Sequence, residues 1–351
     1  MPSSFLHSTP EGQEMESIIV TSPSVASRVT VEQPRPGPGD VLVRIRACGI
    51  CGSDSLYVEM GGAPPHFTET PLGHEPAGEV VAVGASVSGV AVGDHVVINP
   101  MAQDGVIGNG GPRGALAEFL LLPDAIAGQD FRVIPSEIPW SVAALNEPMA
   151  VAYHGVNRSG ATQGTKAVVF GAGPIGLGAA IGLAAKGAEH VVVVDVVARR
   201  LEKALAVGAD AVINSAEEDV VARLRELHGE VPGFYGAPPR PATDVYLDAA
   251  GAPAVFQTVM SAVKHRAVYT IVAVYKDAVE LDLQQALTSE VDIRLSMGYP
   301  TEIFSVTDSI IADWQKYQHI ISDLVPFAEV ERALTLARTP GAADKVIVTF
   351  D

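Results

Sequence analysis

The chain of 351 residues lacks any uninterrupted apolar run of 18 residues, and its longest apolar stretches, such as Val191 to Val194, have the length of a strand. A helix that crosses a bilayer is therefore not expected. Residues 1–14 are polar and lack the basic and apolar regions of a secretory signal peptide. We expect residues 1–15 to form a disordered tail.

Cysteine and basic side chains are also scarce. Two cysteines cannot form a disulfide framework, which fits a reducing cytoplasm. The 23 basic residues face 41 acidic ones, which gives a formal net charge of −18. Such a surface repels phosphate backbones and anionic lipids, so neither a nucleic acid nor a membrane is an expected partner. The length and the hydrophobic content of 48% indicate a globular protein of two domains.

The order of predicted elements changes near Lys166. Before it, short strands alternate with turns, at 17–21, 41–47, 78–83, 95–99 and 117–122, and one helix is expected from Ser141 to His154. After it, apolar strands at 167–170, 190–195, 211–214 and 245–249 alternate with helices at 174–186, 198–207 and 217–227. This alternation predicts a parallel sheet covered on both faces. A Pro/Gly-rich surface loop is expected over 229–243, and a last strand over 345–350 returns to the first domain.

A glycine-rich run, Gly171-Ala172-Gly173-Pro174-Ile175-Gly176, lies between an expected strand and an expected helix. In a dinucleotide site the first glycine allows the tight turn and the second lets the pyrophosphate approach the backbone. The third allows close strand–helix packing. Asp195 closes the next strand 24 residues after Gly171, where a carboxylate would bond the adenosine ribose. It would repel a 2′-phosphate, so NAD is favoured, while the neighbouring Arg199 and Arg200 keep NADP open. The alternative is a glycine-rich turn that binds no nucleotide.

A second group of residues has the chemistry of a catalytic zinc site. Cys51-Gly52-Ser53-Asp54 is followed by Gly73-His74-Glu75 and, later, by Glu147. A thiolate, an imidazole and a carboxylate are suitable zinc ligands when one position stays open for substrate. Zinc then acts as a Lewis acid on a bound alcohol, and Asp54 is a candidate partner for the outer nitrogen of His74. A satisfied core histidine is the alternative for His74.

Cys48 and Cys51 also form a C-x-x-C pair, which has two other interpretations. A redox pair would normally open a helix, and Gly52 disfavours a helix start there. A structural site of four cysteines would need two more than the chain has. A mixed ligand set that uses Cys51 remains, with Cys48 as a small buried apolar residue.

These motifs together resemble the zinc-dependent medium-chain dehydrogenase/reductase (alcohol dehydrogenase) family, especially its sorbitol, threonine and butanediol dehydrogenase branch. The similarity extends over about residues 17–351 and includes Val92-Gly93-Asp94, Glu147 to Gly155, Arg200-Leu201 and Gly208-Ala209-Asp210. The resemblance implies an α/β protein with a β-rich, GroES-like (chaperonin-10-like) catalytic domain and a Rossmann domain with a doubly wound parallel sheet. We expect the catalytic domain at 16–155 and 299–351 and the NAD-binding domain at 156–298.

The resemblance also implies roles for individual residues. Cys51 and His74 would bind zinc, with Glu75 as a direct or exchangeable ligand and Glu147 as a ligand directly or through water. Ser53 would bond the substrate oxygen and pass its proton toward the nicotinamide ribose. The expected NAD-binding residues are Gly171, Gly173, Pro174, Ile175, Gly176, Asp195 and Arg200. Relatives are dimers or tetramers, so a homodimer or homotetramer is expected.

Two departures from the family pattern bear on the site. Many relatives carry four cysteines that bind a structural zinc, and none lies between His95 and Glu118 here, so one zinc per chain is expected. Leu56 stands where relatives often have a histidine of the proton relay, which His66 or a chain of waters would replace. Together with Tyr57 and Phe119, Leu56 would make the mouth of the pocket more apolar.

The sequence therefore predicts a cytoplasmic, zinc-dependent and NAD-linked dehydrogenase of a secondary alcohol, with polyols, amino alcohols and cyclic or terpenoid alcohols as candidate substrates. The alternatives are a zinc-independent reductase of an activated C=C or imine and a non-catalytic nucleotide-binding protein. Against the reductase, Cys51 and Ser53 are both present, whereas reductases on this scaffold commonly lose one of them.

Overall fold

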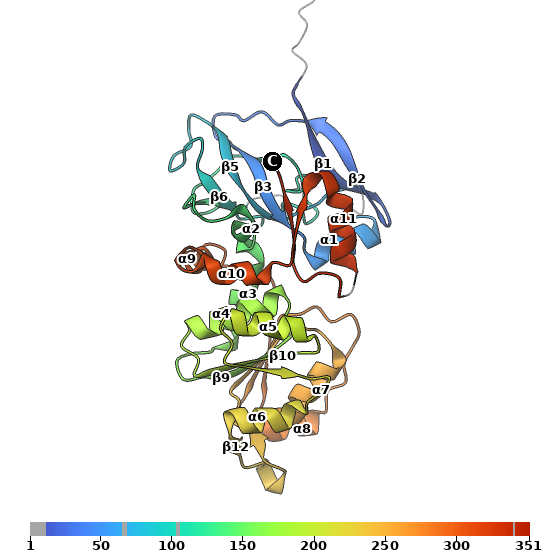
Figure 1. Cartoon of the computed structure of the whole chain (residues 1–351), viewed down its shortest axis with the longest axis vertical. Helices are drawn as coiled ribbons and strands as arrows, with labels where there is room; N and C mark the ends of the chain where they lie inside the picture. The colour runs from blue at the N-terminus through green and yellow to red at the C-terminus, as the bar shows by residue number, and fades with distance from the viewer. Residues whose placement is uncertain (1–11, 65–68, 103–105, 340) are drawn as a thin grey trace, which may run out of the picture. The chain divides into compact units, whose positions relative to one another are not determined.

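A computed structural model describes residues 12–64, 69–102, 106–339 and 341–351 (Figure 1). The chain divides into two compact units. The first comprises Met1–Ser136, Pro326–Arg338 and Val348–Asp351, and the second comprises Glu137–Val325 and Thr339–Ile347. The functional domain boundaries at 155 and 299 remain predictions. Among the described residues, no helix combines the length and the apolar character that a membrane span requires.

The first unit is rich in β-structure, as predicted. Antiparallel strands β1 (Glu14–Ser22) and β2 (Val25–Glu32) form a small sheet with β4 (Thr70–Pro71). A seven-stranded sheet has the order β17-β18-β3-β5-β6-β8, with β7 paired to β3. Its strands are β3 (Val41–Gly49), β5 (Glu75–Val83), β6 (His95–Ile98), β7 (Phe119–Leu122), β8 (Phe131–Ile134), β17 (Asp323–Pro326) and β18 (Val346–Thr349). Helices α1 (Gly52–Met60) and α11 (Val330–Arg338) pack against each other beside these sheets.

The second unit contains a parallel sheet of six strands in the order β11-β10-β9-β14-β15-β16. These are β9 (Lys166–Phe170), β10 (His190–Asp195), β11 (Ala211–Asn214), β14 (Val245–Asp248), β15 (Val268–Ile271) and β16 (Asp292–Leu295). When the strands of this sheet alone are numbered along the chain, the order is 3-2-1-4-5-6, that of a doubly wound dinucleotide fold. The predicted Rossmann architecture is confirmed.

Helices cover both faces of the parallel sheet (Figure 1). On one face lie α3 (Asn146–Ser159), α4 (Pro174–Ala185) and α5 (Ala198–Ala206). On the other lie α6 (Val220–His228), α7 (Pro253–Ala262) and α8 (Leu283–Ser289). The apolar residues of α6 and α7 form a core with the strands of the sheet. This core includes Val168, Val192, Leu224, Tyr246 and Val259. The unit also holds α9 (Ser305–Ala312) and α10 (Trp314–Tyr317).

Three expected elements differ from the structure. The helix expected over 141–154 is two helices, α2 (Trp140–Ala143) and α3, and Pro139 rather than Ser141 precedes the first. Pro148 lacks an N–H and would clash with the carbonyl of Ala144 in a continuous helix, whereas the first turn of α3 accepts it. The loop expected over 229–243 contains a short hairpin, β12 (Glu230–Val231) and β13 (Arg240–Pro241). Strand β1 begins at Glu14, inside the expected tail, whose residues 1–11 lie outside the described part of the chain.

Candidate metal centre and cofactor site

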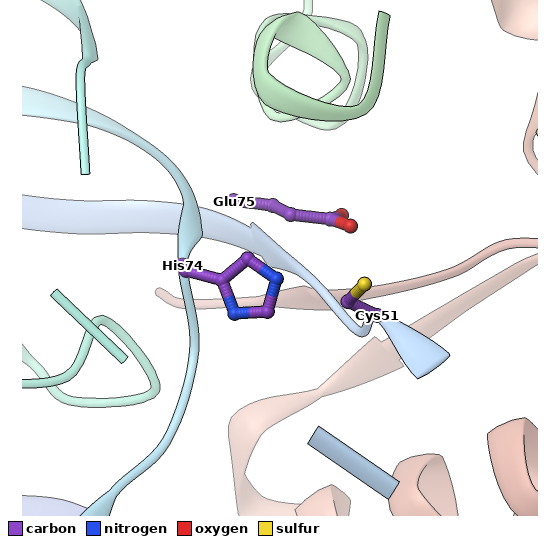
Figure 2. Close-up of side chains that lie close together, drawn as sticks. All are labelled: Cys51, His74 and Glu75. Atoms are coloured by element: carbon purple, nitrogen blue, oxygen red, sulfur yellow. The ribbon is translucent and has the colours of Figure 1, made fainter. Parts of the chain in front are cut away.

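The side chains of Cys51, His74 and Glu75 converge in the first unit. Their donor atoms all lie within 4.8 Å of one another, and Figure 2 shows the thiol, the imidazole and the carboxylate facing one another. Donors that share one tetrahedral zinc at about 2.0–2.3 Å are about 3–4 Å apart. The three groups therefore need only a small approach to share one ion, and the donor set fits zinc.

Strand pairing explains why residues 23 positions apart meet. Strands β3 and β5 are antiparallel, and Gly49 at the end of β3 pairs with Glu75 at the start of β5. Cys51 follows β3 and occupies the N-cap position of α1. A helix therefore does begin at Gly52, and the expectation that this glycine disfavours a helix start was wrong. Gly73 has φ +92°, and a Cβ there would collide with the backbone of Leu116, so the turn into His74 requires glycine.

The fully buried carboxylate of Asp54 joins the two segments that carry the donors. One oxygen accepts from the N–H of Cys51 (2.9 Å), and the other accepts from the N–H of Gly73 (3.2 Å) and lies 3.5 Å from Nδ1 of His74. Asp54 thus lies at ion-pair distance from the outer nitrogen of His74, where a partner was expected, and this nitrogen makes no hydrogen bond among the described residues. Nε2 of His74 is left as the nitrogen that faces the other donors.

The electrostatics of this cluster favour a cation. Burial lowers the pKa of His74, but the Asp54 carboxylate and Cys51 raise it, and the net pKa lies well above its ordinary value. The pocket thus stabilises positive charge at the imidazole, which is the sign of charge that a metal ion carries. Cys48, by contrast, is fully buried, and burial followed by the charge of Asp54 raises the pKa of its thiol. Cys48 is a neutral, small core residue, as predicted.

Ser53 and Tyr57 place hydroxyl groups on α1. The Ser53 Oγ lies 3.3 Å from Nε2 of His74, so the predicted substrate-binding hydroxyl is beside the donors. The half-buried Tyr57 donates to Asn109 (3.1 Å), a partner that the sequence did not suggest. Leu56 is 47% exposed on the same helix. His66, the suggested relay residue, lies outside the described residues.

Two other predicted residues are not among the three converging donors. Glu147 is buried in the first turn of α3, in the second unit, and its role as a ligand remains a prediction. The ring of Phe119 lies under the Arg44 guanidinium (5.2 Å) and lines a groove of about 400 Å³ with Phe327 and Phe350. None of the three donors lines that groove. Phe119 is therefore not placed in a pocket with the metal centre.

The glycine-rich run forms the expected turn between β9 and α4. Gly171 has φ +93° and donates to the Val194 carbonyl (2.8 Å), while Pro174 opens α4. A Cβ on Gly176 would overlap the Gly171 carbonyl, which is the close packing predicted for the third glycine. A Cβ on Gly173 would meet nothing within 4 Å. The second glycine thus borders open space at a helix N-terminus, where a pyrophosphate fits.

Asp195 braces this loop from the neighbouring strand. Its carboxylate accepts from the N–H groups of Ala172 (2.7 Å) and Val197 (2.9 Å). A carboxylate has about four acceptor positions, so two remain for ribose hydroxyls. Arg200, also predicted at this site, is paired through Nε with Asp344 (2.7 Å). No sequence pattern pointed to Asp344, which lies 144 residues further along the chain.

Asp248 has a structural role at the same edge of the sheet, where it is level with Phe170. One oxygen accepts from the N–H groups of Ala250 and Gly251 (both 2.9 Å). The other accepts from the hydroxyls of Tyr269 (2.9 Å) and Tyr275 (2.5 Å). These contacts give Asp248 a role in the turn that follows β14.

Comparisons with known proteins agree with this architecture. Residues 37–129 match the alcohol dehydrogenase GroES-like domain, and residues 174–313 match the zinc-binding dehydrogenase domain. The chain is 30% identical to a sorbitol dehydrogenase of Bombyx mori over 92% of this chain and 96% of that protein. It is 31% identical to (R,R)-butanediol dehydrogenase of Bacillus subtilis (strain 168), over 81% of this chain and 84% of that one.

A solved structure extends the comparison to the cofactor. A Sinorhizobium meliloti 1021 protein, crystallised with bound NADP, matches with a TM-score of 0.82 and 25% identity, over 96% of this chain and 99% of that one. The fold, the metal donors and the glycine-rich turn therefore have one common explanation. The chain belongs to the zinc-dependent medium-chain alcohol dehydrogenase family, whose members use a nicotinamide cofactor.

Proposed function

We propose that this dehydrogenase catalyses the reversible, NAD-linked oxidation of a secondary alcohol to its ketone with one zinc ion per chain. The observation that carries the proposal is the convergence of Cys51, His74 and Glu75, with Asp54 bracing both segments. Polyols, amino alcohols and cyclic or terpenoid alcohols are the candidate substrates, and the sorbitol and butanediol dehydrogenases among the relatives support a polyol.

The chain's own residues would bind the metal, the substrate and the cofactor. Cys51, His74 and Glu75 would hold zinc, with Glu147 competing as a ligand directly or through water. Zinc, when bound, supplies a Lewis acid that lowers the pKa of an alcohol hydroxyl. Ser53 would hydrogen-bond the substrate oxygen and take its proton toward the nicotinamide ribose. The turn from Gly171 to Gly176 would hold the pyrophosphate so that NAD can accept the hydride from the carbinol carbon.

A single zinc is favoured because Cys48 is the only cysteine besides Cys51 and is buried in the core. The reductase alternative is disfavoured because the ligand thiol of Cys51 and the hydroxyl of Ser53 are both present and adjacent to His74. NAD is favoured over NADP because the Asp195 carboxylate would face a 2′-phosphate. A cytoplasmic location is proposed because the chain has only two cysteines, which fits a reducing compartment.

A homodimer or homotetramer is proposed from one of the two edges of the parallel sheet, the edge formed by β16. Among the described strands, β16 pairs with β15 alone. Around this edge, several large apolar side chains are strongly exposed: Leu283 (72%), Leu287 (77%), Leu295 (69%) and Met297 (87%). An unpaired strand edge with exposed apolar side chains is suited to pairing with a second copy of the chain.

A screen of NAD reduction tests the function. The purified protein is offered polyols, amino alcohols, cyclitols and terpenoid alcohols, and we expect turnover with at least one secondary alcohol. Turnover should disappear on chelation and return with added zinc. Reduction of an activated C=C or an imine that persists after chelation would contradict the proposal and support the reductase alternative.

A further inference from the structure

We propose that Asp344 sets the preference of this enzyme for NAD over NADP, because its carboxylate neutralises the cations at the start of α5. The inference rests on the proposed NAD-linked function and extends it to a residue outside the glycine-rich turn and outside β10. It concerns four charged side chains of the second unit: Arg199, Arg200, Lys203 and Asp344.

One carboxylate serves all three cations. Asp344 lies 3.4 Å from Nη2 of Arg199, 2.7 Å from Nε of Arg200 and 2.9 Å from Nζ of Lys203. The Asp344 side chain is only 2% exposed, whereas the three cationic side chains are 22–49% exposed. Burial raises the pKa of Asp344, but the hydrogen bonds from Arg200 and Lys203 outweigh it and hold the pKa below its usual value. The carboxylate is therefore ionised at neutral pH.

The cations lie next to the expected adenosine end of the cofactor. Asp195 ends β10, its carboxylate accepts from the N–H of Val197, and α5 begins at Ala198. Arg199 and Arg200 are thus in the first turn of the helix that follows the ribose-binding carboxylate. Positive side chains in a first turn oppose the helix dipole, unless an anion is bound there. Asp344 is the anion that the protein itself supplies.

These ion pairs weaken the binding of the 2′-phosphate, the group that distinguishes NADP from NAD. Arginine side chains are well suited to a phosphate because the guanidinium offers paired donors. In this chain the Nε–H of Arg200 donates to Asp344. Arg199 donates to the Gly341 carbonyl (2.8 Å) in addition to its ion pair with Asp344. Asp344 and Asp195 then both disfavour the phosphate: Asp195 repels it directly, and Asp344 occupies the cations that would offset that repulsion.

The carboxylate can be removed without displacing the chain that carries it. The N–H groups of Asp344 and Lys345 both donate to the Ser322 hydroxyl (2.9 and 3.0 Å). This anchor is independent of the Asp344 side chain. Asp344→Asn keeps the size and one acceptor oxygen, and it removes the charge alone.

The experiment compares equilibrium binding of NADH and NADPH to the full-length protein, by fluorescence titration, in the wild type and in three variants. Asp344→Asn should tighten NADPH binding relative to NADH by about tenfold, the size of one charge-assisted hydrogen bond. Asp344→Glu, which restores the charge, should keep the wild-type ratio. Glu329→Gln removes the same charge from an exposed pair with Arg332 in the first unit. This control variant should also keep the wild-type ratio of NADPH to NADH affinity.

An unchanged ratio in Asp344→Asn, or a loss of NADH affinity with no gain for NADPH, would overturn the inference. If the single variant does not fold, Asp344→Asn with Lys203→Gln removes one charge of each sign and should still favour NADPH. Failure of the proposed function is distinguishable, because it would appear as an absence of NAD reduction with every alcohol in the screen, a readout that does not depend on the ratio of the NADH and NADPH affinities.

Discussion

The carboxylate of Asp54 contacts both chain segments that supply the metal donors. It accepts from the backbone of Cys51 and of Gly73 and lies beside Nδ1 of His74. It therefore fixes the two loops and orients the imidazole at once. The motif C-x-x-D predicted the contact with His74, but the two backbone contacts depend on the pairing of β3 with β5 and could not be derived from the sequence.

Asp54→Asn should lower zinc affinity by about 10–100-fold, because the replacement removes the charge that orients and polarises His74. Competition with a chromogenic chelator measures the affinity. Glu59→Gln is the matched control, since Glu59 is exposed on the same helix and loses the same charge. Equal zinc affinities in the two variants would show that the Asp54 charge does not contribute to zinc binding.

His228 should make the second unit less stable in weak acid. Burial, followed by the charges of His190 and Lys166, lowers its pKa from 6.5 to about 4. The unfolded chain then binds a proton that the folded chain excludes, so the free energy of unfolding falls as pH decreases from 6.5 toward 4.

His228→Gln should reduce this pH dependence when urea unfolding is measured across that range. His265→Gln is the control, because the His265 side chain is 47% exposed. It should leave the pH dependence of the free energy of unfolding unchanged. The same slope in wild type and His228→Gln would show that His228 is not its source.

In the glycine-rich turn between β9 and α4, one glycine is needed for packing and another for cofactor binding. Gly176 is closed in by the Gly171 carbonyl, whereas Gly173 borders open space and has extended backbone angles that alanine also adopts. Gly173→Ala should fold with wild-type stability and bind NADH more weakly, because the methyl group fills the space for the pyrophosphate. Gly176→Ala should lose about 1–3 kcal/mol of stability through overpacking.

Thermal unfolding and NADH titration of both variants test this distinction. Wild-type NADH affinity in Gly173→Ala would contradict the placement of the pyrophosphate. Loss of stability in Gly173→Ala equal to that in Gly176→Ala would contradict the difference in packing.

Elements with a strong local pattern were predicted well, and those that depend on distant partners were not. Strand β10 was expected at 190–195 and β11 at 211–214, and both have these bounds, because each contains an uninterrupted apolar run. No element was assigned to residues 250–298, which contain β15, β16, α7 and α8. Asp344 was missed for a related reason: only the fold brings it to Arg200.

At the scale of the whole molecule, we expect the apolar edge at β16 to join two chains. Leu295→Glu with Met297→Glu should convert a dimer to a monomer, or a tetramer to a smaller assembly, because it places charges on the strand edge that would be buried. Light scattering coupled to size-exclusion chromatography gives the mass. Val92→Glu, at a side chain of the first unit that is 65% exposed, is the control and should keep the oligomer. An unaltered mass in the double variant would place the interface elsewhere.

We expect the chain to bind one catalytic zinc through Cys51. The most direct test is the zinc content of purified, undialysed protein, measured by inductively coupled plasma mass spectrometry in wild type, Cys51→Ser and Cys48→Ala. We predict about one zinc per chain in wild type and in Cys48→Ala, and a loss of zinc and of alcohol oxidation in Cys51→Ser, with NADH binding retained. Wild-type protein without zinc, or equal zinc in Cys51→Ser, would contradict the account.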